Sequence, residues 1–251
     1  LMGHARGILK GRKDESGLKA ELQEAFKVTD NLSLVVRGPG SFGLENLEVP
    51  QIAPHEVLLK PAYVGICGTD REIISGRLGY YASGVAKYPI VLGHEYSASV
   101  VKVGSNVKHL KIGDQVVGEC ILSCGHCGQC SHNHRLSCPE RQEVGVLGVN
   151  GALASLVKVP GQRVHIIPQN LPLKTAVLTE PTAVVIHSLK CADLWNSSEK
   201  NSRILITGLG SIGQIAAQLL KNRGYNDLSF FDISKKIHFS LCKSNIHKWC
   251  F

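Results

Sequence analysis

The sequence lacks long hydrophobic runs. No apolar stretch reaches 18 residues, and the densest one, 205–220, is interrupted by three glycines, so it is too short to cross a bilayer. The beginning of the chain also lacks the apolar core of a secretory signal. We therefore expect no membrane partner and a cytoplasmic location. The leading Leu1 suggests a record that starts inside a longer reading frame.

Excess positive charge is scarce in the body of the chain. The formal net charge is +8, from 28 basic and 20 acidic residues. Residues 1–27 and 233–251 together hold +6 of it, which leaves +2 for residues 28–232. A nucleic-acid groove would concentrate basic residues within the fold, so we expect no nucleic-acid partner. The 251 residues, 43% of them hydrophobic, suffice for a large core and two domains.

The number of cysteines, nine, is odd, whereas a disulfide framework needs an even number. Five of the nine cysteines lie within residues 120–138, in a chain far longer than a disulfide miniprotein. Four of these follow the spacing C-x2-C-x2-C-x7-C, which lets four thiolates close a tetrahedron around zinc: Cys124, Cys127, Cys130 and Cys138. This spacing favours a structural zinc site. A redox C-x-x-C pair needs only two cysteines, and a nucleic-acid zinc ribbon sets its two pairs further apart.

The hydrophobic pattern divides the chain into two kinds of structure. Short strand-like runs separated by glycine and proline predict an all-β unit, with strands at 32–36, 56–64, 97–103, 115–118 and 152–159. After Pro181 the pattern predicts a helix at 183–189, a polar linker at 196–201, a strand at 203–207, a helix at 211–223 and a strand at 228–231. Such alternation is typical of a parallel α/β unit.

A glycine turn of the G-x-G-x-x-G type joins the strand at 203–207 to the following helix. Its residues are Gly208, Leu209, Gly210, Ser211, Ile212 and Gly213. In this context the glycines permit a tight turn, close approach of a pyrophosphate and close packing of the helix on the strand. Asp232 follows 19 residues after Gly213, where a carboxylate can accept from the ribose hydroxyls of NAD. Because Asp232 would repel a 2′-phosphate, NAD is favoured over NADP, although Lys235 and Lys236 weaken that preference. The alternative is a glycine turn without a ligand.

A second set of zinc-ligand types is scattered along the chain. Cys67 follows a strand in the run GICGTD, His94 stands in LGHE, and a Thr-Glu-Pro run ends at Pro181. One thiolate, one imidazole and one or two carboxylates would give zinc three protein ligands and an open position, the arrangement of a catalytic site. Taken singly, the cysteine is more often a buried apolar residue and the histidine a satisfied core group.

Taken together, these motifs resemble the zinc-dependent medium-chain dehydrogenases of the alcohol dehydrogenase superfamily, over about residues 28–232. The resemblance implies a GroES-like β domain at 28–185, a partial Rossmann domain at 186–251 and an N-terminal extension at 1–27. It also implies that catalytic zinc is held by Cys67, His94 and Glu180, with Glu95 as an alternating or outer ligand. Glutamate at 180 is similar to the polyol, sugar and threonine dehydrogenase branch. Glu72 stands where many relatives have a proton-shuttling histidine.

The expected function is an oxidoreductase that moves a hydride from a secondary alcohol, a polyol or sugar, to NAD(P). Zinc lowers the pKa of a bound hydroxyl, and Thr69 can accept that proton and pass it outward. The expected partners are a small alcohol substrate and, for the full-length protein, further copies of the chain. Two alternatives stay open: an L-threonine 3-dehydrogenase-like enzyme, and a non-catalytic zinc-binding remnant. A metal count separates the non-catalytic remnant from an enzyme that has a catalytic zinc site.

The chain is short for a complete dinucleotide fold, which needs six strands. Four further βα units would add roughly 100 residues. The segment 235–251 lacks the alanine and leucine of a second crossover helix. The sequence therefore suggests C-terminal truncation, and with an unpaired sheet edge we expect this polypeptide to be aggregation-prone and weakly active or inactive.

Overall fold

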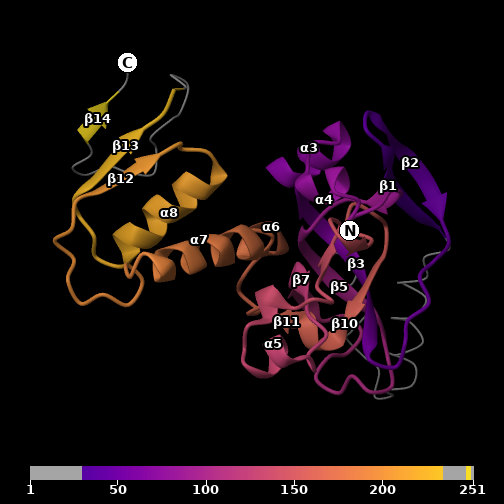
Figure 1. Ribbon diagram of the computed structural model, residues 1–251. Helices are drawn as coiled ribbons and strands as arrows, with labels where there is room; N and C mark the ends of the chain where they lie inside the picture. The colour runs from indigo at the N-terminus through magenta and orange to yellow at the C-terminus, as the bar shows by residue number, and fades with distance from the viewer. Residues whose placement is uncertain (1–29, 234–246, 250–251) are drawn as a thin grey trace. The chain divides into compact units, whose positions relative to one another are not determined.

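The computed structural model describes residues 30–233 and 247–249 (Figure 1). The chain forms two compact units that divide between Val177 and Leu178. The sequence placed the boundary after residue 185, inside what the structure has as one continuous helix. The expected extension at 1–27 lies outside the described residues. None of the helices in the described ranges has the length and apolar content needed to cross a membrane.

The first unit is built mainly of antiparallel sheets. A five-stranded sheet has the order β10-β3-β5-β6-β11, and a three-stranded sheet has the order β2-β1-β4. The smaller sheet β7-β8-β9 lies beside the cysteine-rich segment. The strands are β1 (Asn31–Gly38), β2 (Ser41–Leu47), β3 (Glu56–Gly65), β4 (Ile90–Val91), β5 (Glu95–Val103), β6 (Gln115–Gly118), β7 (Ile121–Leu122), β8 (Gln142–Val144), β9 (Gly148–Val149), β10 (Val157–Pro160) and β11 (Val164–Ile166).

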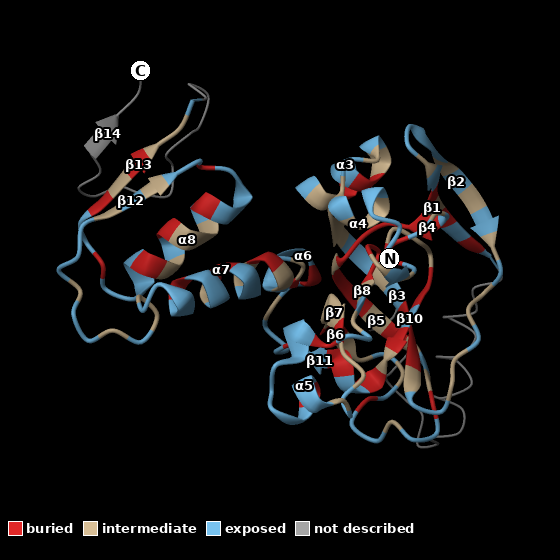
Figure 2. Ribbon diagram, viewed as in Figure 1, coloured by how far each residue is buried: buried red, intermediate tan, exposed pale blue. Residues whose placement is uncertain are grey.

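Buried residues are concentrated on the strands of the first unit (Figure 2). They form a cluster made mainly of valines, with Tyr96 as its aromatic member. Buried residues follow one another along β3 and β6, at Val57, Leu58 and Leu59 and at Val116 and Val117, so both faces of the sheet are covered at these positions. A second cluster packs beneath the first helix and includes Val36, Ile73 and Leu92. Burial of the apolar side chains in these two clusters fixes the register of the strands in the first unit.

Short helices join the strands of the first unit. They are α3 (Gly68–Ser75), α4 (Gly79–Ala82), α5 (Gly128–Ser131), η1 (Arg135–Ser137), η2 (Gly161–Arg163) and α6 (Leu173–Ala176). The sequence pattern gave no sign of α3, which ends at Gly76 in the left-handed conformation that favours glycine. The sequence pattern also did not predict strand β2. In the structure the apolar side chains of Phe42 and Leu44 on this strand are exposed.

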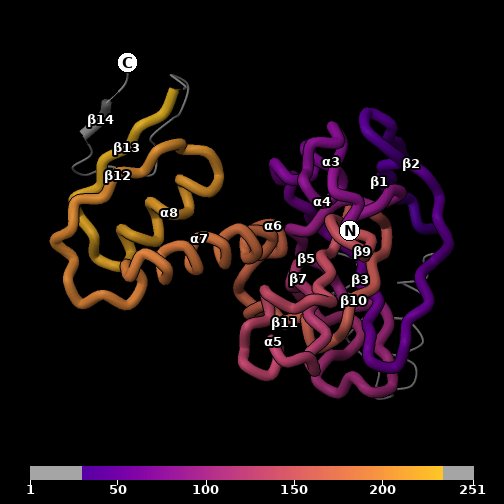
Figure 3. Tube along the Cα trace, viewed as in Figure 1, coloured from indigo at the N-terminus to yellow at the C-terminus, as the bar shows by residue number. Residues whose placement is uncertain are grey.

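The second unit is a parallel α/β segment. It contains α7 (Thr179–Cys191), β12 (Ile204–Thr207), α8 (Ser211–Asn222), β13 (Leu228–Phe231) and β14 (His247–Trp249). The sheet order is β12-β13-β14, with both pairings parallel. Helices α7 and α8 run side by side (Figure 3). Val185 and Leu189 of α7 share a core with Ala217 and Leu220 of α8.

The expected fold class, a β domain followed by an α/β unit, is confirmed. Further details of the elements differ. The strand expected at 152–159 begins only at Val157. Helix α7 begins at Thr179 rather than after Pro181; proline is tolerated there because the first-turn N–H groups have no partner within the helix. Strand β14 lies in a segment for which the sequence predicted no element.

Candidate metal centres and dinucleotide turn

Cys67 is held where strand β3 gives way to helix α3. It is the residue that caps the N-terminus of α3, with extended backbone angles. Its backbone N–H donates to Oδ2 of Asp70 at 2.9 Å. This bond satisfies one of the free N–H groups of the helix start and fixes the direction in which the sulfur projects.

His94 and Glu95 follow the short strand β4 through a turn at Gly93. Gly93 has φ of +97°, and a β-carbon there would lie 2.7 Å from the backbone nitrogen of Leu153, so both conformation and space require glycine. The turn carries His94 into the interior, where it is only 5% exposed. Glu95 then begins strand β5.

These two segments meet. Ligand atoms of Cys67, His94 and Glu95 all lie within 4.8 Å of one another. Glu95 pairs with Gly65 across β3 and β5, and its carboxylate fills the space that a β-carbon at 65 would occupy. A thiolate, an imidazole and a carboxylate suit zinc, so the residues present form a catalytic-type metal group.

Asp70 is a site residue that the sequence reasoning missed. Its carboxylate is 1% exposed and contacts both segments of the group. Besides the bond from Cys67, Oδ1 accepts from the N–H of Gly93 at 3.4 Å and lies 3.6 Å from Nδ1 of His94. A carboxylate on the second nitrogen of a ligating histidine orients the ring and increases its basicity. The sequence feature that could have indicated Asp70 is its position three residues after Cys67, the residue that caps helix α3.

Thr69 lies beside the sulfur of Cys67, with Oγ1 at 3.7 Å from Sγ. A hydrogen bond with His94, supported by Thr69 and opposed by burial, lowers the pKa of the Cys67 thiol. Glu72 is exposed on α3. Glu180 is the second residue of α7 in the second unit, half-buried. The roles of these three residues, proton acceptor, outer proton path and zinc ligand, stay predictions.

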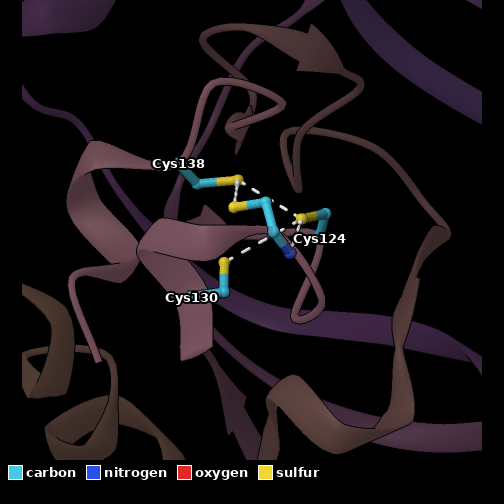
Figure 4. Close-up of side chains that lie close together, drawn as sticks. Cys124, Cys130 and Cys138 are labelled. Carbon is cyan, nitrogen blue, oxygen red and sulfur yellow. Dashed lines mark hydrogen bonds between the residues drawn. The ribbon is translucent and has the colours of Figure 1, made fainter. Parts of the chain in front are cut away.

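The four-cysteine group lies in the loop that carries α5 and η1 (Figure 4). The sulfur of Cys124 lies 3.9 Å from that of Cys130 and 3.6 Å from that of Cys138, and the sulfurs of Cys127 and Cys138 are 3.8 Å apart. A tetrahedron with Zn–S bonds of 2.3 Å has edges of about 3.8 Å. The group therefore has the geometry of a closed, structural zinc site.

The thiols of the group differ in how readily they ionise. A backbone hydrogen bond at Cys130 favours the Cys127 thiolate, but burial and the neighbouring thiols outweigh it and raise the pKa of Cys127 to about 11. Burial raises the pKa of Cys130, but a backbone hydrogen bond at Gly125 and the neighbouring thiols outweigh burial and bring it to about 7. A thiol that ionises near neutral pH is ready to bind zinc, because the thiolate is the ligand. Cys120, which fits no ligand position in the sequence spacing, is not part of the group.

The glycine turn connects β12 to α8 as expected. Gly208 has φ of +83°, and a β-carbon on Gly213 would overlap the carbonyl oxygen of Gly208. Gly210 caps the helix, which begins at Ser211, and Ile212 is half exposed. Packing therefore fixes Gly213, and nothing crowds Gly210. The open space around Gly210 would let a ligand approach its backbone closely.

Asp232 follows β13 and contacts the same turn. Its Oδ2 accepts from the backbone N–H of Leu209 at 2.6 Å. The carboxylate thus stabilises the turn itself, a contact that the sequence reasoning did not predict. Its expected bond to a ribose stays a prediction, as do the cofactor contacts of the other turn residues.

Comparison with known proteins agrees with this description. Residues 53–169 match the alcohol dehydrogenase GroES-like domain. Sorbitol dehydrogenase of Bombyx mori is 33% identical over 82% of this chain and 58% of its own length. L-threonine 3-dehydrogenase of Caldanaerobacter subterraneus is 35% identical over 70% of this chain and 49% of its own. The chain thus spans about half the length of the curated relatives it matches.

A solved structure shows the same fold with a cofactor. An alcohol dehydrogenase from Escherichia coli, crystallised with NADH, superposes with a TM-score of 0.73 at 27% identity. The match covers 83% of this chain and 58% of that one. Both units described above therefore have counterparts in a dinucleotide-binding protein.

Proposed function

Because the chain belongs to the medium-chain zinc alcohol dehydrogenase family, we propose that it serves NAD(P)-dependent oxidation of a secondary alcohol of the polyol or sugar type. The proposal is for a cytoplasmic enzyme acting on small alcohols, assembled from several copies of the full-length protein. The sorbitol dehydrogenase relatives support the polyol class. The observation that carries the proposal is the meeting of Cys67, His94 and Glu95 around one point.

The residues of the first unit would each do part of the work. Cys67 and His94 would hold zinc, and Glu95 would serve as the alternating or outer ligand. When bound, zinc supplies Lewis-acid activation of an alcohol oxygen. Asp70, which links both ligand segments and lies 3.6 Å from Nδ1 of His94, would orient the ring. Thr69 would receive the substrate proton at Oγ1. Glu72, on the exposed face of α3, would pass a proton to solvent.

The second unit would bind the cofactor. The glycine turn at 208–213 would accept the pyrophosphate through Gly210 and the first N–H groups of α8. One oxygen of Asp232 accepts from Leu209, and the other would accept from the ribose. A carboxylate at this position disfavours a 2′-phosphate, so NAD is proposed over NADP.

The test is a metal count together with an activity panel. At stoichiometric zinc the 251-residue chain should hold one ion tightly at the four-cysteine group and a second, which chelator releases readily, at the Cys67 group. Cys67→Ser should remove only the ion of the Cys67 group. Cys191→Ser is the matched control, because Cys191 is exposed on α7 outside both groups. Turnover of secondary alcohols with NAD, expected to be weak at most in the 251-residue chain, should be lost in Cys67→Ser and kept in Cys191→Ser. One tightly held zinc in the wild type would instead support the non-catalytic zinc-binding alternative.

L-threonine is the second candidate substrate, favoured by the threonine dehydrogenase relative. Including L-threonine beside sorbitol and xylitol in the same panel distinguishes the two. A kcat/KM for L-threonine above that for every polyol would replace the polyol proposal.

A further inference from the structure

A third group of metal-ligand types lies against the four-cysteine centre. Ligand atoms of Cys124, His126 and Glu140 all lie within 4.8 Å of one another. His126 lies in the loop between Cys124 and Cys127 and is exposed. The structure brings it and Glu140 to the same side of Cys124, because the loop between Cys124 and Cys127 and the segment after Cys138 both begin at the shared centre.

Neither the imidazole nor the carboxylate is engaged elsewhere. Among residues 30–233 the structure records no hydrogen bond or ion pair for the side chain of His126 or that of Glu140. The nearby guanidinium of Arg141 is already held by the carbonyl of Leu136, by Tyr80 and by Glu143. Both candidate ligands are therefore available to a cation, and Arg141 does not neutralise Glu140.

There is room for an ion with water ligands. Cys124 and Glu140 line an open hollow of about 590 Å³ beside the lobe, which gives water ligands space next to these two side chains; His126 is not among the residues that line it. Charge favours a cation here as well: four thiolates around one Zn²⁺ leave a net charge of about −2, and Glu140 adds another negative charge. A divalent ion next to the filled centre would offset this repulsion.

We propose that Cys124, His126 and Glu140 form a second, labile site for a borderline divalent metal such as Zn²⁺ or Cd²⁺, with the Cys124 thiolate bridging the two ions. One sulfur, one nitrogen and one oxygen suit such ions, and water completes the coordination. The site binds more weakly than the four-cysteine centre, because two exposed side chains must be ordered. It does not depend on the proposed oxidoreductase activity.

The experiment measures bound Cd²⁺ by equilibrium dialysis on the 251-residue chain and on the variants His126→Asn and Glu140→Gln. Each variant should bind one equivalent fewer at moderate free Cd²⁺, or bind it at least about tenfold more weakly. The matched controls are His134→Asn, an exposed histidine of the same lobe, and Glu199→Gln, an exposed acid of the second unit, and both should retain the wild-type count. Equal counts in all five proteins would overturn the site.

Cadmium-113 NMR tests the bridge and the integrity of the lobe together. The wild type should give an all-sulfur resonance coupled to a second resonance, because both ions share the sulfur of Cys124. In His126→Asn the all-sulfur resonance should persist and lose its coupling partner, which shows that the lobe is folded. An all-sulfur resonance with no coupling partner in the wild type would overturn the bridging role of Cys124, because cadmium at the separate Cys67 group shares no sulfur with it.

Discussion

The carboxylate of Glu95 lies over Gly65, its cross-strand partner, in the space that any β-carbon at 65 would fill. The absence of a side chain on β3 thus gives a carboxylate of β5 its position beside Cys67 and His94. The register of the sheet, which pairs Gly65 with Glu95, therefore couples the glycine on β3 to the position of the carboxylate on β5.

Gly65→Ala should therefore displace Glu95 and weaken the first metal group. The methyl group would overlap the carboxylate, which must rotate away from the sulfur of Cys67. We expect faster loss of the labile zinc to chelator and no change at the four-cysteine centre. Gly43→Ala on β2 is the control, because nothing lies within 4 Å of its added carbon. The rate of zinc release, followed with a colorimetric chelator, checks this; equal rates in the two variants would contradict it.

Asp70→Asn should lower zinc affinity at the Cys67 group by about 10–100-fold, the usual effect of removing a partner that orients a metal ligand. The amide keeps the shape of the side chain but removes the negative charge near Nδ1 of His94. Competition with a chelator of known affinity measures the change. Asp227→Asn, exposed in the second unit, should bind zinc as the wild type does; if Asp70→Asn does so too, the orienting role is wrong.

The two glycines of the turn should respond differently to alanine. Gly213→Ala places a carbon against the carbonyl of Gly208 and should cost about 1–3 kcal/mol of unfolding free energy in the second unit. Gly210→Ala meets no neighbour, so it should leave stability unchanged while weakening NAD binding. Thermal denaturation and NAD titration of both variants separate packing from ligand approach. A stable Gly213→Ala would show that the turn relaxes.

Tyr81 should make the first unit less stable at alkaline pH. Burial, together with the nearby Tyr88, raises the pKa of Tyr81 to about 12. In the unfolded chain a tyrosine ionises near pH 10. The folded state therefore holds its proton longer, and the stabilisation present below about pH 10 is lost as the pH rises towards 12. Tyr81→Phe should lose less unfolding free energy than the wild type over this interval, measured by urea denaturation. If the unfolding free energies of the wild type and Tyr81→Phe depend on pH in the same way, Tyr81 does not cause the loss of stability.

The sequence by itself determined the features that depend on local spacing. The four zinc-type cysteines lie within 15 residues, so a short loop brings them together whatever surrounds it. The glycine turn was equally readable, because its strand, turn and helix are consecutive and the steric demand of Gly213 is local. Strand β6 and strand β13 also lie where the pattern put them.

Only the tertiary structure decided which distant groups meet. Cys67 and His94 are 27 positions apart, and no periodicity reports that the end of β3 and the turn at Gly93 face each other. The same holds for Asp70, whose two oxygens contact segments that only the sheet brings together, and for His126 and Glu140 beside Cys124. Helix propensity and strand alternation describe each element alone. Burial of the shared core fixes their register, and that register places a sulfur, an imidazole and a carboxylate at one point.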